Sequence, residues 1–539
     1  MRKYLFIFKK RRLKLILLAL VSTIASIVGI VTVYYTGSYI DVVVEATEIN
    51  PILWISVVLL IVTTTGILLN FIFSFLKMTL VETFVYEIKK WILSHLRKTS
   101  LIEYKKMDST YLSKRIDEDS RQIVQFFTDN YYAVILKFIE LVVVGILILT
   151  INFSLGSLMF ILSPIYFLAY LFFRKLIFQK TLEAREETAV FFSKFTHQLV
   201  CLEHIIIESD FTKEDSSLNG AFSIYYQKFM AYVVVTAKLR LLQGFIVGIM
   251  QLLVFFIGGM SVLEGITSIG LLTTLMVYFA QILGNISYYT DLAKKYQINK
   301  TSLHRMDEIL SLPEVEEGEN KLNQVCHINA NVTFFIDNKK VLDNIILEAQ
   351  SNEVIGIVGG NGTGKSTLVK LLVGAIKAKS SEHFSIIFNN KFHISELDCV
   401  KLRENSLSYV PQRINFKDLT LGEVMNEVHN YKSSQDFITT INAESMILNE
   451  DISEFIIMNW SSRMNQLSGG DRQLVAILRS IAKKSSSLII MDEPTVNLDM
   501  IRVDWFKRAM KQVKYGRIIL IVTHENSIEE IFDKTINLD

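Results

Sequence analysis

The chain has 539 residues, of which half are apolar and only 20% are charged, and this composition argues against a purely soluble protein. A mean hydropathy of +0.35 indicates an integral membrane protein. The net charge of +2 gives no electrostatic basis for binding nucleic acid, so we expect no nucleic-acid partner.

The N-terminal half contains six apolar stretches, each long enough to cross a hydrocarbon core about 30 Å thick. They lie at residues 13–35, 52–76, 132–151, 155–178, 241–262 and 269–289. The basic start, with Arg2, Lys9 and Arg11, is similar to a signal sequence, but no small-residue cleavage site follows it. We therefore predict an uncleaved first span and an all-α transmembrane domain of six helices in the lipid bilayer.

Basic residues predict the orientation of these spans. Lys and Arg are concentrated in the two long connections, for example at Lys89, Lys213 and Arg240, whereas the three short connections contain none. Since positively charged connections stay on the cytoplasmic side, both termini and both long connections are predicted to be cytoplasmic, in a plasma membrane.

The long connections are themselves helical in pattern. Apolar residues recur at helical spacing in 81–97, 183–199 and 225–239, so we expect the spans to continue into the cytoplasm. A Lys at the bilayer centre costs about 2.5–3.5 kcal/mol, so Lys137 and Glu140 are placed at the cytoplasmic end of the third span. A paired or snorkelling structural role is favoured for them over a proton or substrate role.

A helix-breaking, glutamate-rich segment that begins at Leu312 and Pro313 separates the two halves. The predicted organisation is a transmembrane domain at 1–310, a linker at 311–323 and an α/β domain at 324–539. In the last of these, β-rich runs such as 354–358, 385–388 and 488–491 alternate with helical patterns.

The α/β domain contains the phosphate-binding pattern G-x-x-x-x-G-K-[ST], in the run Gly359, Gly360, Asn361, Gly362, Thr363, Gly364, Lys365, Ser366 and Thr367. A predicted strand precedes the run and a predicted helix follows it, so backbone N–H groups and the helix N-terminus can surround a nucleotide's phosphates. Lys365 would reach the β- and γ-phosphates, and the Ser366 hydroxyl would ligate Mg²⁺. The pattern predicts a P-loop NTPase domain.

The apolar run 488–491 ends in two carboxylates, Asp492 and Glu493. Phosphoryl transfer needs one acidic group for Mg²⁺ and a second to polarise the attacking water. Asp492 fits the first role and Glu493 the second. Alone, such a pair more often marks a solvated strand end, but a phosphate loop in the same domain favours the catalytic interpretation.

Ser468, Gly469 and Gly470 precede an apolar helical stretch at 474–478, and small residues at a helix N-terminus can bind an anion. With Leu467 and Asp471 they resemble the L-S-G-G-Q signature of ATP-binding-cassette (ABC) proteins. The resemblance includes five motifs in the family's order: the phosphate loop, the Q-loop ending at Gln412, the signature, Asp492-Glu493 and the switch histidine His524. Residues 497–499 resemble the D-loop.

This resemblance implies roles for individual residues. It implies a catalytic set of Glu493, His524 and Gln412, with His524 as the sensor of the γ-phosphate. It implies that the phosphate loop together with Ser468, Gly469 and Gly470 binds ATP, and that Mg²⁺ is held by Ser366, Gln412 and Asp492.

The membrane half resembles ABC exporters at 258–270, the turn between spans five and six, and at 111–117, after the first coupling helix. The whole chain therefore resembles a half-size exporter, in which 104–110 and 209–215 would contact the nucleotide-binding domains. In the family, a signature motif completes the phosphate-loop site of the opposite domain. The partner is thus a second half-transporter, with a homodimer preferred and a heterodimer open.

Three features depart from the family's pattern. Asp471 replaces the usual Gln of the signature and places a carboxylate near a bound triphosphate, so we expect slower turnover rather than none. Residues 460–466 lack the Gly-Glu-Arg pattern of multidrug exporters. Phe335 is the best candidate for the aromatic residue that stacks on adenine, with an unrelated core role equally open.

The expected function is ATP-driven export of a small molecule or peptide. The Gly-Gly-Asn-Gly form of the phosphate loop resembles that of small-peptide and cyclic-peptide exporters. No peptidase segment precedes the first span, so we do not expect this chain to cleave a leader peptide. Two alternatives stay open: export of a lipid or drug, and an ATP-gated regulator or channel that does not pump.

Overall fold

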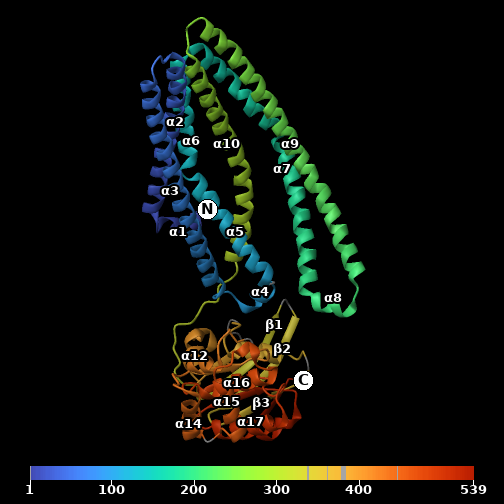
Figure 1. Ribbon diagram of the computed structural model, residues 1–539. Helices are drawn as coiled ribbons and strands as arrows, with labels where there is room; N and C mark the ends of the chain where they lie inside the picture. The colour runs from blue at the N-terminus through green and yellow to red at the C-terminus, as the bar shows by residue number, and fades with distance from the viewer. Residues whose placement is uncertain are drawn as a thin grey trace. The chain divides into compact units, whose positions relative to one another are not determined.

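Long helices form the N-terminal part of the computed structural model, which describes residues 2–107, 109–336, 339–360, 362–377, 384–414, 416–445 and 447–538 (Figure 1). The chain divides into two units, one of Met1–Ser94 with Ser109–Ser311 and the other of His95–Asp108 with Leu312–Asp539. The described helices of the first unit are η1 Arg2–Tyr4, α1 Leu5–Lys9, α2 Arg12–Glu45, α3 Ile49–Leu96, α5 Ser109–Asn130, α6 Ala133–Ile151, α7 Phe153–Val200, α8 Leu202–Glu208, α9 Phe211–Leu263 and α10 Ile269–Leu310.

Six helical segments among the described residues are long and apolar enough to cross a membrane, and the six predicted stretches lie within them. The prediction of an all-α, six-helix transmembrane domain is therefore confirmed. The helix α3 has 48 residues, which at about 1.5 Å per residue is about 72 Å, far more than the hydrocarbon core requires. The helices α3, α7 and α9 thus continue without a break past their apolar stretches, and their extension into the cytoplasm stays a prediction.

Within the first unit, α7 and α9 run side by side and α8 connects them at one end (Figure 1). Buried residues of both helices, Tyr170 and Ile177 from α7 and Leu239 from α9, form an apolar cluster between them. In α6, Lys137 Nζ donates to Glu140 Oε2 at 2.8 Å, which is the paired arrangement that the sequence favoured.

The first and last spans approach each other closely at Gly37 of α2 and Gly270 of α10. A Cβ atom added at Gly37 would lie 2.5 Å from the carbonyl oxygen of Gly270, so only glycine fits there. Next to this contact, Asp41 accepts hydrogen bonds from the Ser268 hydroxyl and the Gly270 amide, each at 2.6 Å. The Asp41 carboxylate therefore caps the N-terminus of α10, which fixes the contact between the two helices.

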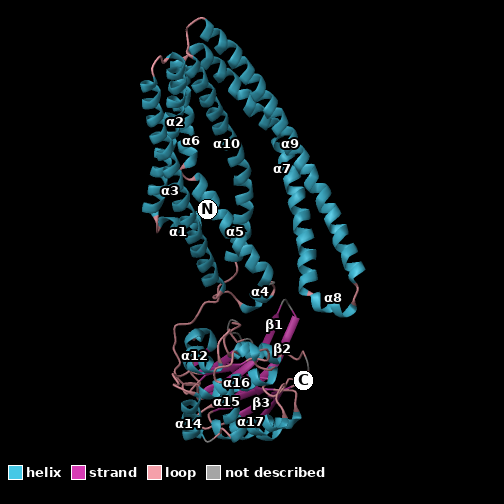
Figure 2. Ribbon diagram, viewed as in Figure 1, coloured by secondary structure: helices cyan, strands magenta, loops and turns pink. Residues whose placement is uncertain are grey.

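Every strand among the described residues lies in the second unit, as Figure 2 shows in magenta. A four-stranded antiparallel sheet has the order β2-β1-β4-β5, and a five-stranded parallel sheet has the order β6-β7-β8-β3-β9. The strands are β1 His327–Ile336, β2 Lys339–Gln350, β3 Val354–Val358, β4 Phe384–Phe388, β5 Phe392–His393, β6 Leu407–Val410, β7 Leu488–Asp492, β8 Ile518–Val522 and β9 Lys534–Asn537.

Helices surround these sheets and bury two apolar clusters against them. The described helices are α4 Leu101–Lys105, α11 Lys365–Leu372, η2 Ile394–Glu396, α12 Cys399–Asn405, α13 Leu421–Asn426, α14 Ser434–Ser445, α15 Glu450–Asn459, η3 Met464–Gln466, α16 Gly469–Ala482, α17 Met500–Val513 and η4 Asn526–Ile531. Every residue of β7 and β8 is buried, as expected for central strands of a parallel sheet that is covered on both faces. The α/β prediction for this part of the chain is confirmed.

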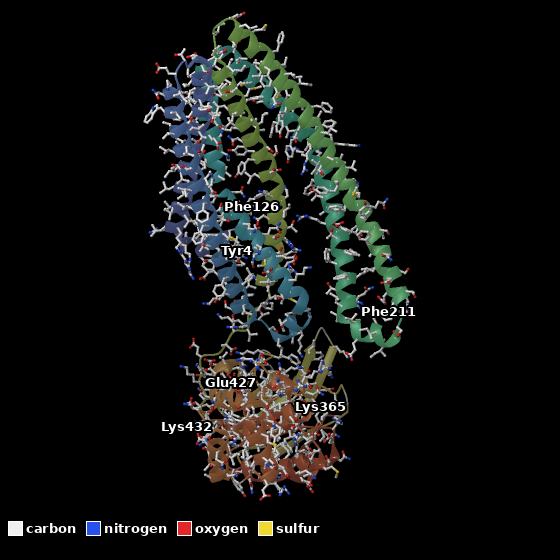
Figure 3. The ribbon with its side chains drawn as sticks, viewed as in Figure 1. Tyr4, Phe126, Phe211, Lys365, Glu427 and Lys432 are labelled. Atoms are coloured by element: carbon white, nitrogen blue, oxygen red, sulfur yellow. The ribbon has the colours of Figure 1, made fainter. Side chains whose placement is uncertain are left out.

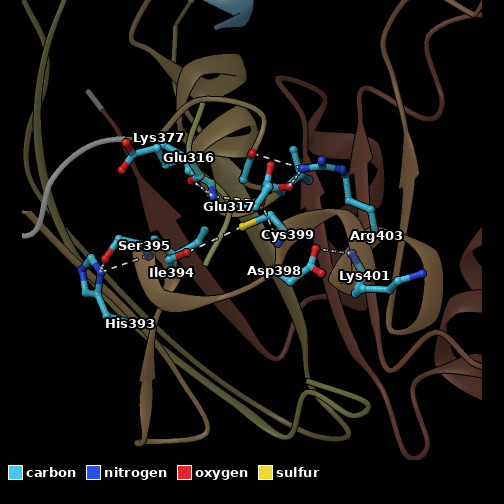
Figure 4. Close-up of polar contacts among 12 residues, drawn as sticks. Glu316, Glu317, Lys377, His393, Ile394, Ser395, Asp398, Cys399, Lys401 and Arg403 are labelled. Atoms are coloured by element: carbon cyan, nitrogen blue, oxygen red, sulfur yellow. Dashed lines mark hydrogen bonds and ion pairs between the residues drawn. The ribbon is translucent and has the colours of Figure 1, made fainter. Parts of the chain in front are cut away.

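The glutamate-rich linker is not a free tether, because its residues bond to the second unit. Glu317 Oε2 accepts from Lys377 Nζ at 2.8 Å and from the Cys399 amide at 3.0 Å, as Figure 4 shows. Burial raises the pKa of the neighbouring Cys399 thiol to about 11, so the thiol stays protonated at neutral pH.

The short helix α4, which follows α3, also belongs to the second unit. The Val315 amide donates to the Lys98 carbonyl at 2.7 Å, and the Ser100 amide donates to the Pro313 carbonyl at 3.3 Å. Leu101 and Ile102 pack against an apolar cluster of the second unit. The contact expected at 104–110 lies directly after these apolar side chains and stays a prediction. Asp108 lies outside the described residues.

The contact between α2 and α10 generates a first prediction. Gly37→Val should reduce the stability of the membrane unit by about 1–3 kcal/mol, because the added side chain overlaps Gly270 and Thr274. The yield of monodisperse protein and its melting temperature in detergent should both fall. Gly29→Val is the matched control on the same helix, since a Cβ there meets nothing within 4 Å, and it should leave both values unchanged.

Candidate active site

The order of the parallel strands brings the predicted site residues to one edge of the sheet. The strands β6, β7, β8 and β3 are consecutive neighbours and all run in the same direction, so their carboxyl ends meet at the same edge. Gln412 follows β6, Asp492 ends β7, and His524 follows β8, while the phosphate loop follows β3. Residues far apart in the sequence thus share one site.

The phosphate loop has the backbone that its glycines permit. Gly362 and Gly364 have φ angles of 89° and 95°, and a Cβ at Gly364 would lie 2.7 Å from the Val341 carbonyl oxygen. The helix α11 begins at Lys365, so its first turn directs amide N–H groups that have no helical acceptor toward the loop. This arrangement fits a triphosphate. The predicted residue Asn361 lies outside the described residues.

Lys365, which Figure 3 labels in the second unit, is only 7% exposed. Its ammonium group donates to the carbonyl oxygens of Gly359 at 2.6 Å and Gly360 at 2.7 Å. Thr363 Oγ1 donates to the same Gly360 carbonyl at 3.1 Å. The ammonium group is therefore held at the loop, where it can replace its bonds to backbone oxygens by bonds to phosphate oxygens.

Asp492 and Ser366 form a pair that fits a magnesium ion. The Asp492 carboxylate is 4% exposed, and burial raises its pKa, although a hydrogen bond from Ser366 opposes the rise. Hydroxyl and carboxylate oxygens are ligands that Mg²⁺ accepts, and Mg²⁺ commonly uses one or two protein ligands together with phosphate oxygens. The described residues contain no group of three or more His, Cys, Asp or Glu that could hold a metal, and this chemistry does not require one.

Glu493 is held at both carboxylate oxygens. Gln412 Nε2 donates to Oε2 at 2.6 Å, and His524 Nδ1 lies 3.1 Å from Oε1, where a protonated Nδ1 donates. The Glu493 backbone has a φ angle of 51°, a left-handed conformation that is uncommon for a residue with a side chain. Its amide donates to the Val522 carbonyl at 2.8 Å. The structure therefore brings together the three side chains that the sequence grouped as catalytic.

The sequence interpretation missed Gln473, which lies in the signature helix α16. Its side chain is 2% exposed and Nε2 donates to the Glu493 carbonyl at 3.4 Å. A polar residue beside the apolar stretch of an otherwise buried helix was the available signal. Gln473 thus connects the signature helix to the turn that carries Glu493.

The signature turn begins α16, and its first residues are bonded to one another. Ser468 caps the helix by accepting from the Asp471 amide at 3.1 Å, and its hydroxyl donates to Asp471 Oδ2 at 2.6 Å. Asp471 Oδ1 lies 2.8 Å from a guanidinium nitrogen of Arg502. Burial acts to raise the pKa of Asp471, but the hydrogen bonds from Ser468 and Arg502 outweigh it, so the pKa lies below its usual value.

Phe335, the candidate for adenine stacking, lies in β1 and is 53% exposed. The core role that the sequence left open for it is therefore wrong. An exposed ring is available for stacking, and that role stays a prediction.

Comparison with known proteins agrees with the geometry of this site. A family model for the ABC transporter transmembrane region matches residues 15–286, and a model for the ABC transporter ATP-binding domain matches residues 342–496. The chain is an ABC transporter. It carries one membrane region and one ATP-binding region, which makes it a half-transporter that is embedded in a membrane and acts as a dimer, with ATP hydrolysis coupled to transport.

Several known proteins are similar to this ABC transporter over nearly its whole length. The lactococcin-A transport/processing ATP-binding protein of Lactococcus lactis subsp. lactis is 25% identical over 98% of this chain and 74% of its own. A putative export ATP-binding/permease protein of Rickettsia typhi is 25% identical over 100% of this chain and 93% of its own. A bacterial Atm1-family ABC exporter with ATP bound has the same fold, with a TM-score of 0.78, 17% identity and coverage of 98% of this chain and 93% of that chain.

The buried Asp492 generates a second prediction. Since burial raises its pKa in the folded protein, ionisation at neutral pH costs stability, and Asp492→Asn should raise the melting temperature of the nucleotide-free transporter. The gain should shrink as the pH falls toward the pKa of Asp492, because the wild-type carboxyl group is then neutral. The same variant should lose Mg²⁺-dependent ATP hydrolysis by roughly 100-fold or more. A lower melting temperature at neutral pH would contradict the assignment.

Gln473 generates a third prediction. Gln473→Leu should lower kcat for ATP by roughly ten- to a hundredfold with little change in KM, because the turn that carries Glu493 loses its hydrogen bond. Steady-state hydrolysis in lipid nanodiscs measures both constants. Ser480→Ala, at another buried polar position of α16, is the matched control and should leave kcat unchanged.

Proposed function

We propose that this ABC transporter exports a peptide and hydrolyses ATP at two composite sites of a homodimer. One observation carries the enzymatic part: Glu493, held by Gln412 and His524, lies at the sheet edge that also carries Asp492 and the phosphate loop. Two observations support the peptide. The phosphate loop has the Gly-Gly-Asn-Gly form of small-peptide and cyclic-peptide exporters, and one relative is named for lactococcin-A transport.

Each side chain then has a role in the hydrolysis. Lys365 and the loop amides bind the triphosphate, and Ser366, Asp492 and Gln412 hold Mg²⁺, which supplies charge neutralisation at the phosphates when it is bound. Glu493 orients the attacking water and accepts its proton as the bond between the γ-phosphorus and the bridging oxygen breaks. ADP and phosphate are the products. Gln412 and His524 hold the two oxygens of Glu493 in the orientation that this step needs.

The homodimer follows from the completeness of the chain's motifs. Ser468, Gly469 and Gly470 of one chain would complete the phosphate-loop site of the second chain. Because this chain carries both a phosphate loop with Glu493 and a signature turn, two copies provide two complete sites. A heterodimer with another half-transporter is the alternative, and the oligomer that purifies from the native membrane distinguishes the two.

The proposed arrangement in the membrane follows from charge. We propose a transmembrane domain at 1–310, a linker at 311–323 and an ATP-binding domain at 324–539. Both termini and both long connections would be cytoplasmic in the plasma membrane, because Lys and Arg are concentrated there. Labelling of single cysteines at Glu264 and Lys213 by an impermeant thiol reagent tests this orientation, and only the first should react in intact cells.

Glu493→Gln provides the test of the pump. The variant should retain ATP binding, lose hydrolysis by roughly a thousandfold or more and stop ATP-dependent peptide uptake into inverted vesicles. It should also accumulate as an ATP-bound dimer. The matched control is Glu525→Gln, in the same sheet-edge region but bonded to Thr495, and it should keep most of the activity.

The outcomes separate the alternatives. Stimulation of ATP hydrolysis by peptides, rather than by lipids or hydrophobic drugs, supports the proposed substrate class, and the reverse result replaces it. ATP-dependent currents without accumulation would identify a channel. A Glu493→Gln protein that hydrolyses ATP at the wild-type rate, or an enzyme that is fully active as a monomer, would overturn the proposed function.

A further inference from the structure

The signature turn of this transporter carries a charge that works against its proposed task. Asp471 is the third residue of α16, and its carboxylate lies 2.6 Å from the Ser468 hydroxyl. A turn that binds a triphosphate gains from the positive end of the helix, and a carboxylate in the first turn cancels that gain. The Ser468 proton is also directed at the carboxylate, which competes with phosphate for it. The turn therefore needs a compensating group.

Arg502 is placed to compensate the charge of Asp471. It lies in the first turn of α17, and one guanidinium nitrogen lies 2.8 Å from Asp471 Oδ1, the oxygen that Ser468 does not use. The two side chains are each 22% exposed, so water screens the pair only in part. The carboxylate and the guanidinium together are neutral, which leaves the glycine amides of the turn as its net positive feature.

Three further contacts fix Arg502 in this place. The guanidinium lies over the ring of Phe455, 5.2 Å from its centroid. Arg502 Nε lies 3.6 Å from Asp499 Oδ2, and the Arg502 amide donates to Asp499 Oδ1 at 2.8 Å. The segment before Asp499 also touches the signature turn, since a Cβ at Gly470 would lie 2.4 Å from the Asn497 carbonyl oxygen. These contacts enclose the Arg502 side chain, which distinguishes it from a surface arginine that only screens charge.

We propose that Arg502 is a positioning residue of the composite ATP site, which neutralises Asp471 and lets a signature turn with an aspartate receive a triphosphate. The proposal rests on the proposed function, because the turn must meet the nucleotide of a second chain. When a phosphate arrives, Ser468 transfers its hydrogen bond from Asp471 to the phosphate, and Arg502 retains the carboxylate. Without Arg502, the free carboxylate repels the nucleotide and holds the serine.

The test compares the full-length transporter in lipid nanodiscs with Arg502→Met, Asp471→Asn and the double variant. Arg502→Met should raise KM for Mg-ATP roughly tenfold, since one partner of a partly buried charge pair is removed. The increase should shrink at high salt, because the repulsion is screened. In the double variant, KM should return to within about twofold of the Asp471→Asn value, because the repelling charge is gone.

Two controls separate charge compensation from folding. Arg508→Met removes the same charge from an exposed position of α17 and should leave KM unchanged. Should Arg502→Met misfold, Asp471→Asn alone still decides, because it removes the carboxylate that repels the nucleotide and should lower KM. Arg502→Met that has wild-type kinetics, or a defect that Asp471→Asn does not correct, would overturn the proposal and leave Arg502 as a structural tie.

The outcome of this test is distinct from that of the proposed function. A Glu493→Gln variant that still hydrolyses ATP would overturn the composite catalytic site whatever the Arg502 variants do. If Glu493→Gln is inactive and the Arg502 defect is not corrected by Asp471→Asn, only the inference about Arg502 fails.

Discussion

The parallel alignment of β6, β7, β8 and β3 is the constraint on which the active site depends. Neighbouring strands lie about 4.8 Å apart, so side chains that follow their carboxyl ends come within bonding distance of one another. Gln412, Glu493 and His524 follow three adjacent strands in this order, and they form one hydrogen-bonded set. Apolar clusters bury both faces of the sheet, which holds this edge in place.

At that edge the protein accepts local conformations and charges that oppose its stability. Glu493 adopts a left-handed backbone, and Asp492 keeps a carboxylate in a place where burial raises its pKa. Surrounding residues hold the Glu493 backbone in this conformation. Its amide donates to the Val522 carbonyl, and its carbonyl accepts from Gln473. Such unfavourable features persist where the chemistry requires them. Phosphoryl transfer requires one carboxylate near the metal ion and a second near the attacking water.

The signature turn shows that a departure from a family motif has to be judged with its neighbours in space. On the sequence alone, Asp471 is a negative charge at a site for an anion. In the folded chain it is half of a pair with Arg502, which comes from the helix that follows the D-loop segment. The expectation of slower turnover takes account of Asp471 but not of Arg502. The contact with Arg502 offsets the negative charge that Asp471 brings to the turn.

The sequence by itself determined the six spans, the strands that flank the phosphate loop, and the positions of Lys365, Asp492, Glu493 and His524. Each of these features is encoded by a continuous stretch of the chain, either a run of apolar residues or a short motif between a strand and a helix. Only the tertiary structure decided the rest. Gln473, Arg502 and the Asp41 cap of α10 act through partners that lie on other elements. The apolar residues of α4 pack against a core that is formed by a distant segment of the chain. No local pattern distinguishes such residues from surface ones, because what makes them matter is the partner that the fold brings to them.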